Sequence, residues 1–255
     1  MRALEHSTAA GGAVAIVTGG TRGIGAAIVD RLARRGFDVL AVHRGTNTAP
    51  DYPPVTSPGR VVAFRCDVTD ADAPQRIFDA ADELGDPVVL VNNAGITGAI
   101  GPLRTVSDET MRAVIDVDLI ATMRLSREAV ARWETRAPRD DRSIVNVSSI
   151  AARTGAPGEY VWYAAAKAGV NAFTVGLAGE VAGRGVRVNA VNPGTTTTTI
   201  HERAGRPHRA AEVGARSPLG RPADVQEIAA AVDWLVSTEA SYVTGTVLDV
   251  SGGVR

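Results

Sequence analysis

Short apolar runs alternate along the chain with segments whose apolar residues recur every three or four positions. Brief apolar runs between turn signals are typical of buried strands, and the longer spacing is typical of amphipathic helices. The pattern predicts strands at 13–20, 37–42, 60–68, 87–91, 143–149, 186–191 and 246–250. Strands that alternate with helices in this way favour an α/β fold with one parallel, doubly wound sheet of seven strands.

A glycine-rich turn joins the first predicted strand to a helix. The turn reads TGGTRGIG at 18–25, and the helix after it ends near Gly36. Glycines allow a tight turn, and they let a pyrophosphate approach the backbone N–H groups and the positive end of the helix. We therefore expect a dinucleotide site here, formed by Gly19, Thr21, Gly23, Ile24 and Gly25.

The end of the second predicted strand indicates which dinucleotide binds. An acidic residue there would hydrogen-bond the 2′-hydroxyl of NAD and repel the 2′-phosphate of NADP. This chain instead has His43 and Arg44, and Arg22 of the glycine turn can approach the same ribose. Guanidinium groups suit a phosphate monoester, so the sequence favours NADP(H) over NAD(H). The alternative is that one or both arginines are solvated loop residues.

Further candidates for cofactor contacts follow the other strands. A proline-rich loop at 45–60 is a candidate cover for the adenosine end. Asp67 and Val68 end the third strand, where the polar cluster could meet the adenine or cap the next helix. The motifs NNAG and NPGTTTTTI follow the fourth and sixth strands; they could contact the cofactor, stabilise the sheet or form a plain turn. Their candidate residues are Asn93, Ala94, Gly95, Pro193, Gly194, Thr196 and Thr198.

Three side chains with complementary chemistry occur between the fifth strand and the next helix. Tyr163 and Lys167 are four residues apart, so a helix presents the phenol and the ammonium on one face. A free tyrosine has a pKa of about 10, and a neighbouring cation can lower it by roughly 1–3 units. Ser149 closes the preceding strand, so its hydroxyl can reach the same cleft. The pattern favours acid–base chemistry on a carbonyl, although an isolated YxxxK also occurs by chance.

One acidic residue lies inside a long predicted helix. Ser107 is a suitable N-cap for a helix over 108–133, and Asp118 lies near the middle of that helix between Val117 and Leu119. Asp118 is therefore either on the opposite face of the helix or in a polar cavity.

We expect residues 195–216 to form a substrate lid, because this polar segment lies beyond the carboxyl edge of the sheet. It carries the one local basic cluster of the sequence: His201, Arg203, Arg206, His208 and Arg209. The cluster could attract an anionic substrate or carrier, or it could be a solvated face.

Composition argues against several other classes of protein. The 255 residues include 27 basic and 28 acidic side chains, so no basic excess suggests a nucleic acid partner. We find no apolar leader and no apolar stretch of about 18 residues, and therefore expect a cytoplasmic protein without membrane insertion. The single cysteine, Cys66, and the four histidines do not cluster, so we expect no metal site. We expect one domain over 1–255, with residues 1–12 as a loose lead-in.

The motifs TGGTRGIG, CDV, NNAG, NVSS, YAAAK and NPG stand in an order that resembles the short-chain dehydrogenase/reductase family over nearly the whole chain. Within the family, the chain resembles bacterial 3-ketoacyl-carrier-protein reductases and related sugar or polyketide ketoreductases. The resemblance implies a Rossmann sheet of strand order 3-2-1-4-5-6-7 and a homotetramer. It also implies a catalytic mechanism. NADPH delivers hydride to a carbonyl carbon, Ser149 hydrogen-bonds the carbonyl oxygen, and Tyr163 donates the proton. Lys167 lowers the Tyr163 pKa and holds the nicotinamide ribose.

Asp118 departs from the family pattern, which usually has an asparagine that binds a relay water at this position. An aspartate keeps the acceptor and loses the amide donor. It either pairs with Lys167 and weakens the effect of Lys167 on Tyr163, or holds the water nearly as well, and we expect activity to survive with an altered pH profile. Two alternatives stay open: an NAD(P)-dependent sugar or polyol dehydrogenase, and a non-catalytic dinucleotide-binding sensor. The sequence does not specify the small-molecule carbonyl substrate, carrier-bound or free.

Overall fold

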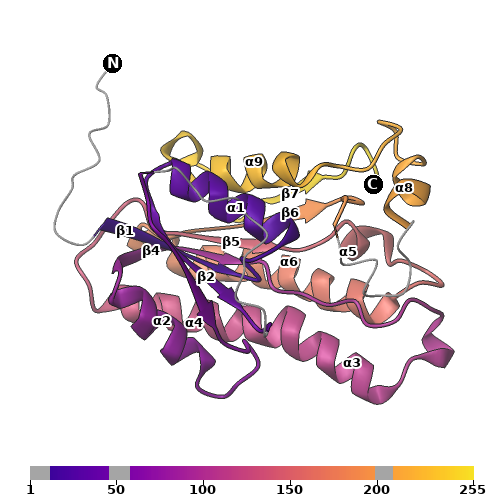
Figure 1. Ribbon diagram of the computed structural model, residues 1–255, viewed down its shortest axis with the longest axis horizontal. Helices are drawn as coiled ribbons and strands as arrows, with labels where there is room; N and C mark the ends of the chain where they lie inside the picture. The colour runs from indigo at the N-terminus through magenta and orange to yellow at the C-terminus, as the bar shows by residue number, and fades with distance from the viewer. Residues whose placement is uncertain (1–11, 46–57, 199–208) are drawn as a thin grey trace.

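The protein forms a seven-stranded parallel sheet with helices on both faces, as the sequence predicts (Figure 1). The computed structural model describes residues 12–45, 58–198 and 209–255. The strand order is β3-β2-β1-β4-β5-β6-β7, which is the doubly wound Rossmann arrangement and confirms the predicted fold. The order of the strands reverses between β1 and β4, and the carboxyl ends of the strands at such a point open a crevice for a ligand.

The strands lie within a few residues of their predicted positions. They are β1 (Gly12–Thr18), β2 (Asp38–His43), β3 (Val61–Arg65), β4 (Gly85–Asn92), β5 (Ser143–Val147), β6 (Arg187–Pro193) and β7 (Val247–Val250). Gly12 begins β1 and so does not belong to the predicted lead-in, whose other residues, 1–11, lie outside the described part. Residues 46–57 of the predicted proline-rich loop also lie outside it.

Three strands, β1, β3 and β5, end earlier than predicted, and the ends of β3 and β5 concern the placement of predicted site residues. β3 ends before Asp67 because the Asp67 carboxylate accepts hydrogen bonds from the Thr69 N–H at 3.0 Å and the Thr69 hydroxyl at 2.8 Å, which turns the chain. β5 ends at Val147, so Ser149 lies in the loop beyond the strand.

Long helices cover both faces of the sheet (Figure 1). One face carries α1 (Gly23–Arg34) and α9 (Val225–Val236), and the other carries α2 (Ala73–Asp82), α4 (Ala121–Glu134) and α6 (Val161–Val181). Along β1, Ala15 and Val17 pack in the core under α1 and α9, whereas Val14 and Ile16 pack in the core under the other three helices. This alternation follows from the strand geometry, which points successive side chains to opposite faces.

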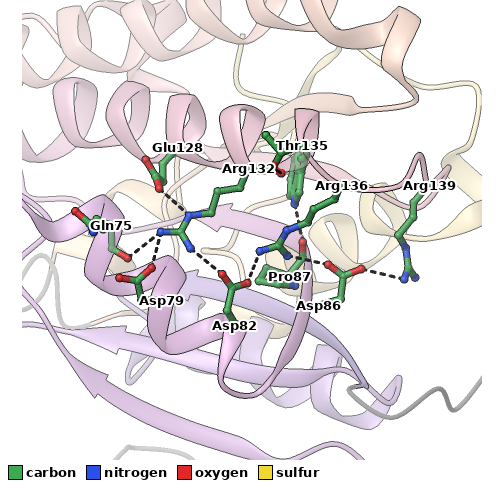
Figure 2. A network of polar contacts seen from close by, with 11 residues as sticks. Gln75, Asp79, Asp82, Asp86, Pro87, Glu128, Arg132, Thr135, Arg136 and Arg139 are labelled. Carbon is green, nitrogen blue, oxygen red and sulfur yellow. Dashed lines mark hydrogen bonds and ion pairs between the residues drawn. The ribbon is translucent and has the colours of Figure 1, made fainter.

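Arginines and carboxylates fasten α2 to α4 (Figure 2). Arg132 of α4 lies 2.6 Å from Asp79 and 2.7 Å from Asp82, both on α2. Arg136 shares Asp82 and continues the network to Asp86 at the start of β4, at 2.9 Å. Isolated surface pairs contribute about 0–1 kcal/mol each, but a network of shared carboxylates holds its geometry better. The network therefore anchors the C-terminal end of α4, the helix whose N-terminal end adjoins the site.

The single helix predicted over 108–133 is interrupted by a π-helical segment. It consists of α3 (Asp108–Ile115), the π segment Asp116–Ile120, and α4. The extra residue of a π turn displaces backbone carbonyls from their usual partners, and here the Thr122 hydroxyl donates to the Asp118 carbonyl at 3.1 Å. Such turns often occur at functional sites. This one places the Asp118 side chain inside the protein, with no exposed surface.

Candidate active site

A cleft of about 1210 Å³ runs along the carboxyl ends of the strands. The loops that follow β1, β2, β4, β5 and β6 form its walls, together with α8 (Arg209–Gly214). Pockets for one drug-sized ligand measure roughly 300–1,000 Å³, so this cleft has room for a dinucleotide and a second small molecule. Every predicted site residue except Thr21 and Asp118 lines it.

The glycine turn is shaped so that its backbone forms the wall of the cleft. Gly19 and Gly23 have φ angles of +63° and +53°, in the left-handed region that favours glycine. Gly25 packs so closely that an added Cβ would lie 2.1 Å from the Gly19 carbonyl oxygen. Asn93 fastens the turn from the β4 side, because its amide donates to the carbonyls of Thr18 at 2.9 Å and Gly19 at 3.2 Å. This bare backbone at the start of α1 fits a pyrophosphate.

Basic side chains stand at the end of β2, as predicted. His43 is buried, Arg44 is exposed, and both line the cleft. The Arg44 guanidinium lies 3.6 Å from the Asp67 carboxylate. Burial raises the pKa of Asp67, but hydrogen bonds from Thr69 and the charge of Arg44 outweigh it and hold the pKa below its usual range. Asp67 is therefore an ionised group on the cleft wall, and it does not cap α2, whose N-cap residue is Asp72.

The loop after β6 forms another part of the wall. An added Cβ at Gly194 would lie 2.8 Å from the Cα of Ser251, so the backbone here is also in close contact. The Thr196 hydroxyl donates to the Gly194 carbonyl at 3.0 Å, which makes the start of the threonine run a hydrogen-bonded turn. Pro193 and Thr198 line the cleft beside it.

Tyr163 and Lys167 emerge from one face of α6, as their spacing predicts, and the loop after β5 brings Ser149 to them. Tyr163 is 8% exposed and Lys167 is 4% exposed. The Ser149 hydroxyl accepts a hydrogen bond from the Ala151 N–H at 3.1 Å and lies near enough to the Tyr163 phenol to oppose the rise in its pKa. The Lys167 Nζ lies 5.7 Å from the centroid of the Tyr163 ring. A hydroxyl, a phenol and an ammonium thus share one part of the cleft wall.

Lys167 is held by two groups other than Tyr163. Its Nζ donates to the Val147 carbonyl at 3.0 Å and lies 3.4 Å from the Asp118 carboxylate. The second Asp118 oxygen accepts a 2.8 Å hydrogen bond from the Ile96 N–H. Of the two environments predicted for Asp118, the structure shows the polar cavity, and of the two roles it shows the pairing with Lys167.

Lys167 is not among the groups that shift the Tyr163 pKa in this structure, so its expected effect on Tyr163 stays a prediction. Burial raises the pKa of Tyr163 well above its ordinary value, the negative charge of Asp118 raises it further, and the Ser149 hydroxyl offsets only part of this. Burial also raises the pKa of Asp118, against the opposing effects of the Lys167 charge and the Ile96 N–H. The ammonium expected to act on Tyr163 lies beside the Asp118 carboxyl group instead.

Known proteins resemble this chain in sequence and in fold. Residues 19–255 match the family model described as enoyl-(acyl carrier protein) reductase. The chain belongs to the short-chain dehydrogenase/reductase family. It is 40% identical over 247 residues to the 3-oxoacyl-[acyl-carrier-protein] reductase FabG of Vibrio cholerae, covering 95% of this chain and 97% of the relative. It is 37% identical over 245 residues to the uncharacterized oxidoreductase YgfF of Escherichia coli, covering 94% and 99%.

Solved structures of the same architecture agree with this assignment. A dehydrogenase/reductase from Sinorhizobium meliloti has a TM-score of 0.85 and 32% identity, with 98% of each chain covered. A blue fluorescent protein from a metagenomic library, in complex with NADPH, has a TM-score of 0.82 and 31% identity, with 96% of this chain and 98% of that chain covered. The protein is an NAD(P)-dependent oxidoreductase of this family.

One side of the oxidoreductase cleft was not anticipated from the sequence. Arg209 at the start of α8 is 4% exposed, pairs with Glu159, and donates to the Tyr160 hydroxyl at 2.9 Å. Of the two alternatives given for the basic cluster, the solvated face is therefore wrong for Arg209. Burial raises the pKa of Tyr160 to about 12, although the nearby Arg209 charge opposes the shift. The other members of the predicted basic cluster lie outside the described residues.

Two further properties concern ligands and location. Within residues 12–45, 58–198 and 209–255, no group of three or more His, Cys, Asp or Glu side chains is arranged to hold a metal ion. None of the helices described there is long and apolar enough to cross a membrane. Cys66 is a buried free thiol, and burial raises its pKa.

Proposed function

We propose that this enzyme reduces a ketone to a secondary alcohol with NADPH. The observation that carries the proposal is the convergence of Ser149, Tyr163 and Lys167 in the same cleft as the glycine turn. The relative from Vibrio cholerae that is named a 3-oxoacyl-[acyl-carrier-protein] reductase supports a ketone as the substrate. The similar structure in complex with NADPH supports the cofactor.

The reduction needs a proton and a hydride, and the chain itself provides the proton. When bound, the cofactor supplies the hydride for the carbonyl carbon. Ser149 donates a hydrogen bond to the carbonyl oxygen, and Tyr163 transfers its phenolic proton to that oxygen as negative charge develops there. Lys167 would hold the nicotinamide ribose, and the glycine turn would hold the pyrophosphate.

The preference for NADPH over NADH rests on the end of β2. His43 and Arg44 stand there in place of the acidic residue that would favour NAD(H). Arg22 also lines the cleft. A 2′-phosphate accepts charge-assisted hydrogen bonds from guanidinium groups. Asp67 keeps Arg44 beside the cleft, so less conformational freedom is lost when a phosphate binds.

The proposed substrate class is a 3-oxoacyl thioester, a polyketide or a small carbonyl compound, presented free or on a carrier. The cleft volume of about 1210 Å³ is compatible with each. We treat the chain as one domain, and we assign α8 to the lid proposed over 195–216, of which residues 199–208 lie outside the described part. The homotetramer and the cytoplasmic location stay predictions.

The proposal is tested by titrating the purified protein with NADPH and NADH by fluorescence, and then assaying ketones that include an acetoacetyl thioester. We expect tighter binding of NADPH, and turnover. Tyr163→Phe should keep NADPH binding and lose roughly 10²–10⁴-fold in kcat, the usual contribution of a general acid. Tyr242→Phe is the matched control, because it removes a hydroxyl from a fully exposed tyrosine.

Other outcomes would replace the proposal. Turnover of sugars or polyols but of no ketone would make the enzyme a polyol dehydrogenase that uses the same residues. Tight cofactor binding without turnover of any ketone or alcohol, together with unchanged behaviour of Tyr163→Phe, would make it a dinucleotide-binding sensor.

A further inference from the structure

Asp118 and Lys167 form an ion pair that is nearly closed to solvent. Their charged atoms are 3.4 Å apart, and the two side chains are 0% and 5% exposed. The π segment turns Asp118 inward, and the Ile96 N–H fixes its second oxygen at 2.8 Å. Burial raises the pKa of Asp118, and both contacts oppose that rise, because one supplies a positive charge and the other a hydrogen-bond donor. The carboxyl group therefore has a fixed position beside the site and beside the Lys167 ammonium.

The charged groups around Tyr163 come from four elements, and they balance. Lys167 on α6 is paired with Asp118 on the π segment. Tyr160 packs edge-on against Tyr163, with ring centroids 5.3 Å apart. The Arg209 guanidinium of α8 lies over the Tyr160 ring, 5.3 Å from its centroid. Arg209 is itself paired with Glu159. The uncharged Ser149 completes the surroundings from the loop after β5.

A phenolate at this position would therefore find no excess positive charge among these neighbours. Tyr163 as a whole is 8% exposed, so water also stabilises a phenolate poorly. Lys167 without a carboxylate partner would favour the phenolate, and with Asp118 beside it the pair is close to neutral overall. The burial and the pairing act in the same direction, toward the protonated phenol.

We propose that Asp118 is a positioning residue that neutralises Lys167 and keeps Tyr163 protonated, so that the enzyme can donate a proton throughout neutral and alkaline conditions. This inference rests on the proposed function, because it assigns Tyr163 the role of proton donor to a ketone. It goes beyond that function because it gives the two directions of the reaction different pH requirements.

The chemistry of reduction and of oxidation explains why their pH requirements differ. In reduction, a hydride from the reduced cofactor adds to the carbonyl carbon, the C=O π bond breaks, and the oxygen takes the proton from the Tyr163 O–H bond. The products are the alcohol, the oxidised cofactor and a phenolate, which regains a proton from solvent. Oxidation reverses each step, so Tyr163 must first lose its proton. The equilibrium constant fixes the ratio of the two directions at any one pH, and Asp118 therefore changes the pH dependence of each direction and not that ratio.

The direct test measures the ionisation of Tyr163 in the ligand-free protein. The chain has four tyrosines, so NMR of protein labelled with ¹³C at the tyrosine Cζ gives a simple spectrum, and Tyr163→Phe identifies the signal. We expect the wild-type signal to stay at its phenol position up to about pH 10, the ordinary tyrosine pKa. Asp118→Asn should lower the midpoint by about one unit or more. Asp116→Asn removes an exposed carboxylate from the same π segment and should leave the midpoint unchanged.

A second readout follows the reaction. Wild-type kcat/KM for the ketone should stay constant from about pH 7 to about pH 10, and that of Asp118→Asn should fall tenfold per unit above its lowered tyrosine midpoint. Oxidation of the alcohol by the wild-type enzyme should rise tenfold per unit over the same range, without a plateau.

The outcomes separate the inference from the function on which it rests. A wild-type Tyr163 signal that titrates below about pH 9 overturns the inference. This result does not depend on whether Asp118→Asn folds or on whether a ketone is reduced. An unchanged midpoint in folded Asp118→Asn also overturns it. If no ketone is reduced while the NMR midpoints move as expected, the proposed function fails and the effect of Asp118 on Tyr163 stands.

Discussion

The Arg209 guanidinium lies over the ring of Tyr160, 5.3 Å from its centroid, and donates a 2.9 Å hydrogen bond to the hydroxyl of the same residue. Tyr160 meets Tyr163 edge-on, with an interplanar angle of 89°. Arg209 belongs to α8, on the side of the predicted lid, and its second partner, Glu159, lies just before α6. The chain of contacts thus connects the lid side of the cleft to the proposed proton donor.

Breaking the Glu159–Arg209 pair should weaken substrate binding more than it slows the chemical step. Arg209→Gln leaves Glu159 and the Tyr160 hydroxyl without their cation and loosens α8 from α6. We expect KM for the ketone to rise about tenfold, equivalent to ~1.4 kcal/mol, with a smaller change in kcat. Steady-state kinetics checks the split. The control is Arg216→Gln, which removes an exposed guanidinium from the same cleft.

A charge exchange makes this test specific. Glu159→Arg combined with Arg209→Glu restores opposite charges at the two positions and should recover most of the KM lost in Arg209→Gln. If Arg209→Gln behaves like Arg216→Gln, or if the exchange recovers nothing, the pair does not hold this side of the cleft.

Arg44→Ala should change the choice of cofactor. The guanidinium is exposed beside the cleft, 3.6 Å from Asp67, where a 2′-phosphate can take its charge-assisted hydrogen bonds. Such bonds contribute about 1.5–3 kcal/mol, so NADPH affinity should fall by roughly tenfold or more while NADH affinity stays the same. Fluorescence titration with both cofactors measures this. Arg65→Ala, at an exposed position on the neighbouring strand β3, controls for the loss of general positive charge. An equal loss for both cofactors would contradict the assignment of Arg44 to the 2′-phosphate.

The strands and the cofactor side of the cleft were predictable because short-range patterns determine them. A strand buried on both faces is an unbroken apolar run, and β1 shows this directly, since four consecutive residues, Val14 to Val17, are fully buried. The turn at Gly19, Gly23 and Gly25 is equally local: left-handed φ angles and the contact with a carbonyl oxygen require glycine whatever the rest of the chain does.

The π segment and the buried arginine were not predictable, because distant partners determine them. The apolar spacing over 108–133 is helical throughout, and the groups that hold Asp118, the Ile96 N–H and Lys167, come from other parts of the chain. Arg209 lies in a polar stretch, and its partner Glu159 is 50 residues away. Nothing near Arg209 in the sequence indicates burial, and the pairing of Lys167 with Asp118 also depends on residues that are far apart in the chain.

Gly25→Ala should abolish cofactor binding. Its Cβ would lie 2.1 Å from the Gly19 carbonyl oxygen and 2.6 Å from the Asn93 amide, so the turn and the β4 loop would have to move apart. Overpacking of this kind costs about 1–3 kcal/mol of stability, and the displaced backbone no longer fits a pyrophosphate. Thermal unfolding and NADPH titration measure the two effects. Gly183→Ala is the control, since an added Cβ there has no neighbour within 4 Å. Retained NADPH affinity in Gly25→Ala would show that the backbone of this turn does not hold the cofactor.

Glu227→Gln should remove a pH-dependent part of the stability. Glu227 lies in the first turn of α9, where the Arg221 guanidinium and the Asp224 N–H donate to its carboxylate and lower its pKa from 4.5 to about 2. A carboxyl group whose pKa is lower in the folded state stabilises the protein above its unfolded pKa, and this contribution is lost as pH falls through the folded pKa. The contribution of Glu227 is therefore complete above about pH 4.5 and disappears toward pH 2.

Urea unfolding of the wild type and Glu227→Gln between about pH 7 and pH 3 measures that contribution. The variant should be less stable at neutral pH, and the difference between the two proteins should shrink steadily below pH 4.5, where the unfolded wild type gains its proton. Glu83→Gln, which removes an exposed carboxylate at the end of α2, should follow the wild type. A difference that stays constant down to pH 3 would mean that Glu227 stabilises α9 through hydrogen-bond geometry that an amide cannot reproduce, and not through its charge.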